Sequence, residues 1–144
     1  MNQSKALWGG RFRSQPDPAL TRYSRSDASH LRLVGFDVAG SRAHALELVR
    51  AGILDDDECR RILATLDAIA AEAANGEIAP VAGDEDIHTF IERHLIERLG
   101  DLGGKLRAGR SRNDQAANDL KLYLREEAKA VSIELLALID ALIG

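Results

Sequence analysis

The chain has 144 residues, with 23 acidic and 19 basic side chains, a formal net charge of −4, 45% hydrophobic residues and 4% aromatic residues. The hydrophobic content excludes a disordered chain, and the lack of any apolar run of about 18 residues predicts no membrane span. The negative net charge argues against nucleic-acid binding. A single cysteine, Cys59, and an N-terminus without a signal-peptide pattern predict a cytoplasmic protein.

Residues 1–29 are predicted to form an irregular N-terminal arm, because Gly and Pro residues interrupt them. From His30 onward the apolar residues have helical spacing, which predicts a helix that ends near Gly52. Asp55 and Asp56 are expected to cap the start of the next helix, whose pattern stops at Asn75-Gly76.

A third helix is predicted to begin around Asp84 and to end at Gly100. Residues 100–110 are predicted to form a Gly-rich loop. Ser111 is then expected to cap a fourth helix, with Asp114 in the reciprocal position of a capping box. No strand-like alternation competes with these patterns, so the predicted fold class is all-α.

The fourth helix is expected to be about 50 Å long. Its apolar residues recur at every third or fourth position over 117–142, as in the seam of a helix bundle. Residues 131–139 are apolar on more than one side and therefore need partners, most of which these 144 residues do not supply. We expect the chain both to oligomerise through this helix and to be a piece of a longer polypeptide.

The densest group of polar side chains lies at residues 105–115. Four cations there fall within eight positions, just before the N-terminus of the fourth helix, where free amides and the helix dipole favour anions. Arg112 offers bidentate recognition of a carboxylate, and Asn113 and Gln115 offer both donors and acceptors. The alternative is that Ser111 is only a helix cap and the charges only a solvated turn.

A second group contains Asp84, Asp86, His88 and Glu92. Helical spacing predicts that Asp84, His88 and Glu92 share one face, where carboxylates could orient the His and raise its pKa. The sequence has no pair of His residues at metal-ligand spacing and no Cys cluster, so no zinc site is predicted. The alternative is an acidic cap followed by an exposed His.

The remaining polar candidates have simpler explanations. The Ser and Asp side chains at residues 24–27 are expected to be N-caps. His44 and His94 fall within helical patterns and are expected to be packing or surface residues. Cys59 follows an acidic helix start and is expected to be inert.

Taken together, three motifs resemble the argininosuccinate lyase family of the fumarase/aspartase superfamily. They are Leu7-Trp8-Gly9-Gly10-Arg11-Phe12, Asp84-Glu85-Asp86-Ile87-His88, and Gly104-Lys105-Leu106 followed by Gly109-Arg110-Ser111-Arg112-Asn113-Asp114-Gln115. Their order and spacing match that family over nearly the whole chain after residue 6. The resemblance implies an N-terminal helical domain over 30–110 and the first long helix of a central bundle over 111–144.

The family cleaves argininosuccinate to arginine and fumarate, the last step of arginine biosynthesis, in a homotetramer without metal or organic cofactor. The resemblance implies that Ser111 and Asn113 hydrogen-bond substrate carboxylates and that Arg112 supplies charge. Ser26 and Gln115 are further expected substrate contacts. Asp86 and His88 match a motif that lines the cleft, where we expect a supporting role. No catalytic residue is expected within this chain.

Two departures from the family pattern bear on these expectations. Arg25 and Asp27 flank Ser26 where smaller or neutral residues are usual, and His30 stands where an Asp is usual, so Ser26 is the weakest of the assignments. The segments that carry the family's catalytic His and its proton-abstracting Ser follow the region matched here. The 144-residue chain alone is therefore predicted to be inactive.

Two alternatives remain open. The chain could be a non-catalytic binding, assembly or structural protein that reuses the helical scaffold, although the intact segment 110–115 favours the enzyme. It could also belong to a sister lyase such as adenylosuccinate lyase or aspartase. The arm at residues 8–12 and the motif at residues 84–88 argue against the sister lyases.

Overall fold

A computed structural model describes residues 17–24, 26 and 28–144. Every regular element in this part of the chain is a helix, which confirms the all-α prediction. The elements are α1 (Pro18–Ser24), the 3-10 helix η1 (Ala28–Leu33), α2 (Val34–Arg50), α3 (Asp56–Ala74), α4 (Ile87–Leu99), α5 (Asp101–Lys105) and α6 (Arg112–Ile143).

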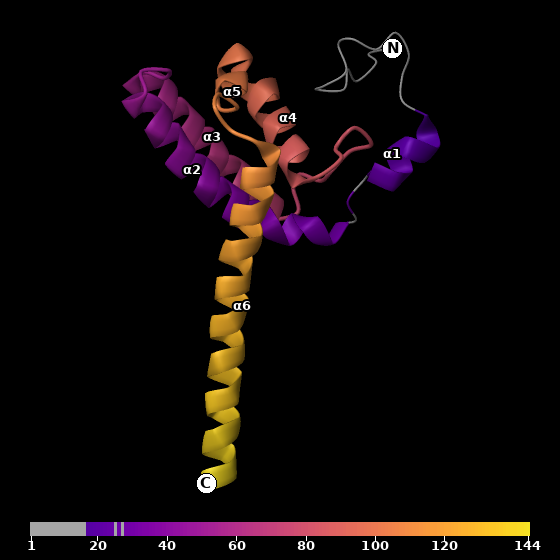
Figure 1. The fold of residues 1–144 in the computed structure, drawn as a ribbon, viewed down its shortest axis with the longest axis vertical. Coiled ribbons are helices and arrows are strands. Elements are labelled where there is room, and N and C mark those ends of the chain that lie inside the picture. Colours follow the sequence, from indigo (N-terminus) through magenta and orange to yellow (C-terminus); the bar gives the residue numbers. More distant parts are fainter. Residues whose placement is uncertain (1–16, 25, 27) are drawn as a thin grey trace.

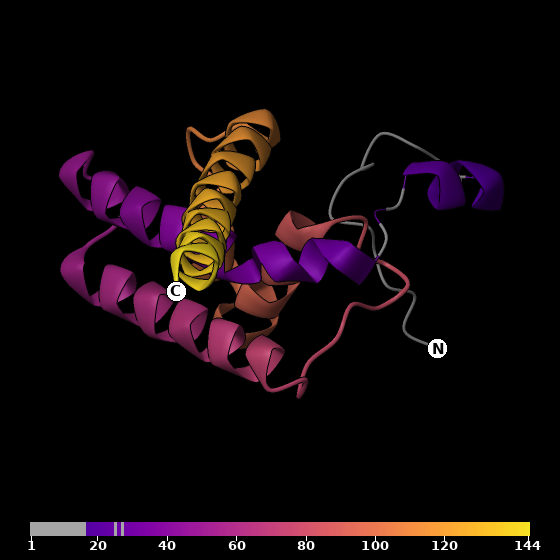
Figure 2. The same cartoon turned by 90° about the horizontal axis from the view of Figure 1, so that it is seen from below.

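Helices α2 to α5 form a head from which α6 extends like a stalk (Figure 1). Helix α3 packs against α2 (Figure 2) and against α4, and α5 packs against α4. Their apolar faces enclose the core, whose most deeply buried side chains include Ile62, Leu66 and Ile69 of α3 and Phe90 of α4. The start of α6 contacts α2 and η1, so this junction brings segments far apart in sequence together.

Side-chain caps set where several helices begin. Asp55 and Glu58 form a complete capping box at α3, as predicted for Asp55, because each side chain accepts a hydrogen bond from the backbone N–H of the other. Ser111 caps α6 by accepting from Asn113 N at 3.2 Å. The reciprocal bond predicted for Asp114 is not among the hydrogen bonds of the described residues.

The prediction that the third helix begins around Asp84 was wrong. Asp86 caps α4, which starts at Ile87, and accepts from Thr89 N at 2.8 Å. Asp84 is buried before the helix and accepts two hydrogen bonds from Arg93, at 2.9 and 2.8 Å. A buried carboxylate needs such a partner, and this bidentate pair holds the loop against α4.

The Gly-rich loop predicted for residues 100–110 contains a short helix, α5, so this prediction was also wrong. Gly100 has a φ of 61°, which turns the chain sharply after α4. Gly103 then lies so close to α4 that a Cβ atom there would come within 2.5 Å of the Leu95 backbone. Glycine serves here to allow close packing, which sequence alone does not distinguish from flexibility.

The N-terminal region departs from the predicted irregular arm in its described part. Residues Pro18–Ser24 form α1, which begins with a proline, and Asp17 accepts a hydrogen bond from Ala19 N at 2.7 Å. The motif at residues 7–12 and the unusual residues Arg25 and Asp27 lie outside the described residues. The division into three domains stays a prediction.

Helix α6 has the length that its sequence pattern predicts. Most of its residues are exposed, because no other described element packs against them. Within α6 only Asp119 is buried. The exposed large apolar residues of this helix are Leu120, Leu124, Val131, Ile133, Leu135, Leu136, Leu138, Ile139, Leu142 and Ile143. None of the helices in the described residues is long and apolar enough to cross a membrane.

Candidate functional site

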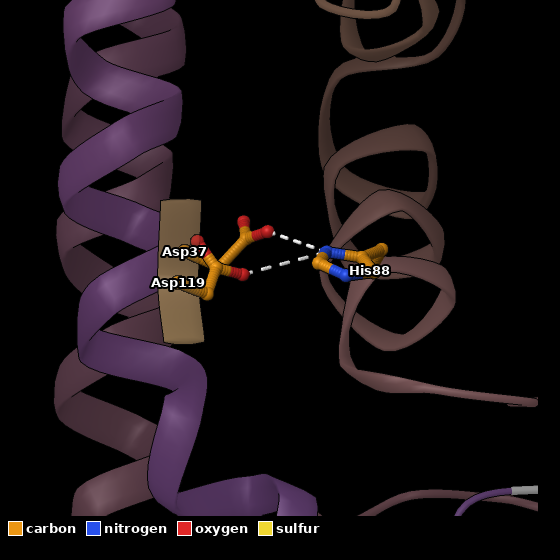
Figure 3. Close-up of side chains that lie close together, drawn as sticks. All are labelled: Asp37, His88 and Asp119. Atoms are coloured by element: carbon orange, nitrogen blue, oxygen red, sulfur yellow. Dashed lines mark hydrogen bonds and ion pairs between the residues drawn. The ribbon is translucent and has the colours of Figure 1, made fainter. Parts of the chain in front are cut away.

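The candidate site lies where the first turns of α6 meet the head. Asp37 comes from α2, His88 from α4 and Asp119 from α6, and Figure 3 shows both carboxylates directed toward the imidazole ring. These three side chains, here called the buried cluster, are 2%, 7% and 1% exposed, respectively. Sequence reasoning found His88 and missed the two aspartates.

Asp37 is the centre of the hydrogen bonding. Its Oδ2 lies 2.6 Å from His88 Nδ1 and accepts a hydrogen bond from Gln115 Nε2 at 3.2 Å. Its Oδ1 accepts from Ser41 Oγ at 3.0 Å. Burial acts to raise the pKa of Asp37, but the hydrogen bond and charge of His88 more than offset it, so this pKa is lowered. Asp37 is therefore an ionised acceptor, and His88 Nδ1 donates to it.

Asp119 is in the opposite state. Its Oδ2 lies 3.7 Å from His88 Nδ1 and is buried without a hydrogen-bond partner. Burial and the neighbouring charge of Asp37 raise the pKa of Asp119 to about 7. Of the two carboxyl groups, Asp119 is thus the one that holds a proton near neutral pH.

The buried cluster is also the one set of described residues whose donors could hold a metal ion, with ligand atoms all within 4.8 Å of one another. The 2.6 Å between His88 Nδ1 and Asp37 Oδ2 is, however, a charge-assisted hydrogen-bond distance. Two ligands of a tetrahedral Zn²⁺ lie about 3.3 Å apart, given metal–ligand distances of about 2.0–2.1 Å. The charge of Arg110 also acts on both carboxyl groups. The geometry fits shared protons better than a cation.

Arg110 connects the cluster to the loop before α6. Its Nη1 donates to Ser41 Oγ at 3.0 Å, while its Nε is buried without a hydrogen-bond partner. Burial lowers the pKa of Arg110. The neighbouring Arg107 and Arg112 both pair with Glu92, whereas no carboxylate of the described residues forms an ion pair with Arg110.

Arg112, the first residue of α6, is hydrogen-bonded to side chains at the start of α4. Its Nη1 donates to both carboxylate oxygens of Asp86, at 2.6 and 2.8 Å, and to Thr89 Oγ1 at 2.8 Å. Burial acts to raise the pKa of Asp86, but hydrogen bonds from Thr89 and Arg112 outweigh it and lower this pKa. Asp86 therefore caps α4 and orients Arg112 at the same time.

Two pockets adjoin these side chains. A pocket of about 50 Å³ is lined by His88, by Gln115 and by three arginines, among others. The arginines are Arg107, Arg110 and Arg112. An open pocket of about 380 Å³ lies between α2 and α6 and is lined by Asp37, Ser41, His44, Arg110, Gln115 and Asp119, among others. Asp37, Arg110 and Gln115 line both, so these three side chains are shared between the pockets.

The other predicted site residues lie nearer the surface. Ser111 and Asn113 are exposed at the first turn of α6, where Ser111 also serves as the predicted cap. Ser26 is exposed, and its backbone N–H donates to Glu85 O at 2.8 Å, next to Asp86. The structure thus brings Ser26 to the same loop as Asp86, and the substrate-contact assignments themselves stay predictions.

The predicted shared face of Asp84, His88 and Glu92 is not formed, because Asp84 precedes the helix and pairs with Arg93. His88 and Glu92 both line the smaller pocket. Of the residues expected to be packing or surface residues, His44 lies 3.0 Å from Ala108 O through Nε2 and so contacts the loop that carries Arg110.

The sequence did contain a signal for Asp37. It lies with Ser41 in the stripe of α2 that faces the core, together with Val34, Ala45 and Leu48. A carboxylate in an otherwise apolar stripe must have buried partners. Which partners it finds depends on residues 51 to 82 positions away, and spacing within one helix cannot show this.

Comparisons with known proteins agree with the resemblance. The sequence model of a family described as Lyase matches residues 10–143. The chain is 58% identical over 137 residues to Argininosuccinate lyase 1 of Pseudomonas fluorescens (strain Pf0-1). It is 54% identical over 142 residues to Argininosuccinate lyase 2 of Rhizobium meliloti (strain 1021), and 52% identical over 142 residues to Argininosuccinate lyase of Thermobifida fusca (strain YX).

These alignments cover 95%, 99% and 98% of this chain, but 29%, 29% and 30% of the respective relatives. The chain therefore spans a little under one third of the length of the curated relatives that it matches.

Proposed function

This chain belongs to the family described as Lyase, and from that premise we propose that it is the N-terminal part of an argininosuccinate lyase. The observation that carries the proposal is the start of α6. There, exposed Ser111 and Asn113 adjoin Arg112, which Asp86 and Thr89 hold in a fixed position. Hydroxyl, amide and guanidinium donors at a helix N-terminus suit a substrate with several carboxylates.

Each predicted site residue has a part in this proposal. Ser111, Asn113 and Arg112 bind substrate carboxylates, with Ser26 as a contact on the neighbouring loop. Asp86 positions Arg112, and His88 positions Asp37. Gln115, at the end of the first turn of α6, lines both pockets and contacts the substrate there.

The reaction breaks the bond between a substrate carbon and the guanidinium nitrogen. A base removes the proton from the carbon next to a carboxylate, the electron pair of that C–H bond forms the C=C bond of fumarate, and the nitrogen leaves with the electrons of the C–N bond. In this proposal the described residues bind and orient the substrate, and the base belongs to the part of the enzyme beyond this chain.

Assembly and location complete the proposal. The exposed apolar side chains of α6 support a homotetramer in which α6 packs into a helix bundle. The enzyme acts in the cytoplasm, in arginine biosynthesis.

A chimeric enzyme tests the proposal. The matching N-terminal 29% of the Pseudomonas fluorescens relative is replaced by this chain, and fumarate formation from argininosuccinate is measured. We expect turnover by the chimera and none by the 144-residue chain alone. Asn113→Ala in the chimera should lower kcat/KM at least about tenfold, the effect of losing one hydrogen bond to a charged group.

Asn75→Ala is the matched control, because Asn75 lies in the exposed turn after α3 and far along the chain from the site. It should leave kcat/KM unchanged. An assembled chimera without turnover, or an Asn113→Ala chimera as active as its parent, would refute the proposed function.

A further inference from the structure

We propose that Gln115 presents its side-chain carbonyl oxygen to the ligand and accepts a hydrogen bond from a ligand N–H group. Gln115 then recognises the nitrogen-bearing part of the substrate and not a carboxylate. The identity of that substrate rests on the proposed function, whereas the orientation of the amide rests on contacts within this chain.

The orientation follows from Asp37. Gln115 Nε2 lies 3.2 Å from Asp37 Oδ2, and a carboxylate can only accept hydrogen bonds. The same oxygen already accepts from His88 Nδ1 at 2.6 Å, and the other oxygen accepts from Ser41 Oγ at 3.0 Å. With the carbonyl oxygen of Gln115 turned toward Asp37, two acceptors would face each other, so the amide nitrogen must point inward.

The carbonyl oxygen is then at the other end of a planar amide. Gln115 is half-buried and lines both pockets, and none of the hydrogen bonds of the described residues uses its Oε1 atom. An amide oxygen has two lone pairs and needs a donor. In the complex, a ligand N–H supplies this donor.

The surrounding charges divide the recognition of the ligand between two sets of groups. Arg107, Arg110 and Arg112 carry only donors and suit carboxylates. The acidic side chains that line the smaller pocket already have partners, since Glu92 pairs with two arginines and Asp37 with His88. Gln115 Oε1 is thus an uncharged acceptor left available in a pocket rich in donors, and it suits the amino or guanidinium N–H of argininosuccinate.

Inhibition of the chimera by its two products separates the two kinds of contact. Arginine carries N–H donors and fumarate carries only carboxylates. We expect Gln115→Met to raise the inhibition constant of arginine about tenfold, the effect of losing one hydrogen bond, and to leave that of fumarate within about twofold. Gln115→Ala should give the same pattern and serves if the Met variant does not assemble.

The matched control is Glu47→Met, which changes an exposed residue of α2 ten positions from Asp37, about 15 Å along the helix. It should change neither constant. A rise in the constant of fumarate equal to that of arginine would show that Gln115 donates to a carboxylate, and an unchanged constant of arginine would show no contact. Either result would overturn the proposal.

A nuclear magnetic resonance measurement on the 144-residue chain tests the orientation separately. Gln115 Nε2 lies 3.5 Å from His88 Nδ1, so the amide protons of Gln115 should show a nuclear Overhauser contact with the imidazole ring. Its absence would overturn the proposal even in an active chimera. An inactive chimera with the contact present would refute the proposed function and leave the orientation standing.

Discussion

The two aspartates of the buried cluster, Asp37 and Asp119, have pKa values that are shifted in opposite directions, so they affect stability differently as the pH changes. Ionised Asp37 is stabilised by three donors, while the raised pKa of Asp119, about 7, means that the fold favours its protonated form. An unfolded Asp titrates near 3.9. Between about pH 4 and 7 the folded chain therefore binds a proton that the unfolded chain releases, and the contribution of Asp119 to the free energy of unfolding falls as the pH rises.

Asp119→Asn removes this titration and keeps the shape of the protonated side chain. We subtract the free energy of unfolding of the parent from that of the variant. This difference should be at least about 1 kcal/mol more positive at pH 8 than at pH 5, because the parent loses stability as Asp119 ionises and the variant does not. Urea unfolding at both pH values measures it. Burial lowers the pKa of His44 and His94, so these residues titrate in the opposite direction, but they do so in both proteins and cancel in the difference. A difference independent of pH would contradict the assignment.

Asp86 has two structural tasks, as the cap of α4 and as the partner of Arg112. Asp86→Ala should lower the free energy of unfolding by about 1–2 kcal/mol, the usual effect of losing a cap together with an ion pair. Asp67→Ala is the matched control, because the exposed pair of Asp67 with Arg42 is worth about 0–1 kcal/mol. Equal losses in thermal unfolding would show that Asp86 is only a surface partner.

Single residues show where prediction from the sequence ended. Ser111 and Asp55 were identified as caps because a cap interacts with residues two or three positions away. Asp119 was missed because its partners, His88 and Asp37, come from two other helices. The side chains around Arg112 were likewise identified as polar without the pairing that holds them. Local contacts could be predicted, and contacts between helices could not.

Helix α5 shows that a whole element, too, can depend on contacts between helices that the sequence does not reveal. The sequence Asp101-Leu102-Gly103-Gly104-Lys105 predicts a loop because glycine is a poor helix former. The structure has a helical turn there because Gly103 permits close contact with the α4 backbone at Leu95. The longer helices α3, α4 and α6 were predicted because their apolar periodicity extends over several turns.

The two glycines of α5 provide a direct comparison. Gly103→Ala would place a Cβ atom within 2.5 Å of the Leu95 backbone, and we expect it to lower the free energy of unfolding by about 2 kcal/mol or more. Gly104→Ala meets no atom within 4 Å and should raise it by up to about 1 kcal/mol, because alanine favours the helix. Urea unfolding of both variants decides the matter, and a tolerated Gly103→Ala would contradict the close packing of α5 on α4.

At the level of the whole chain, the hydrophobic core lies within the head. Most of α6 projects beyond the head (Figure 1). The large apolar residues from Leu120 to Ile143 are about half or more exposed, and a patch of that extent marks an interaction surface. The expectation that the helix belongs to a bundle with other chains stays a prediction.

We expect the 144-residue chain to associate through this face. Size-exclusion chromatography with light scattering should give a mass above 15.7 kDa at micromolar concentration. Leu135→Lys together with Leu142→Lys should shift the chain toward the monomer, because each places a charge in the apolar stripe. Glu127→Lys, an exposed change on the same helix, is the control for added charge. A monomeric parent chain would contradict this account of α6.

The mass of the native protein tests the central claim most directly. An antibody raised against the head would capture the protein from its own cells, and mass spectrometry would give its intact mass. Because this chain spans about 29% of its relatives, we predict a protein about three times heavier than 15.7 kDa that carries these residues at its start. A native protein of 15.7 kDa ending at Gly144 would contradict the claim, and the binding or assembly function would take its place.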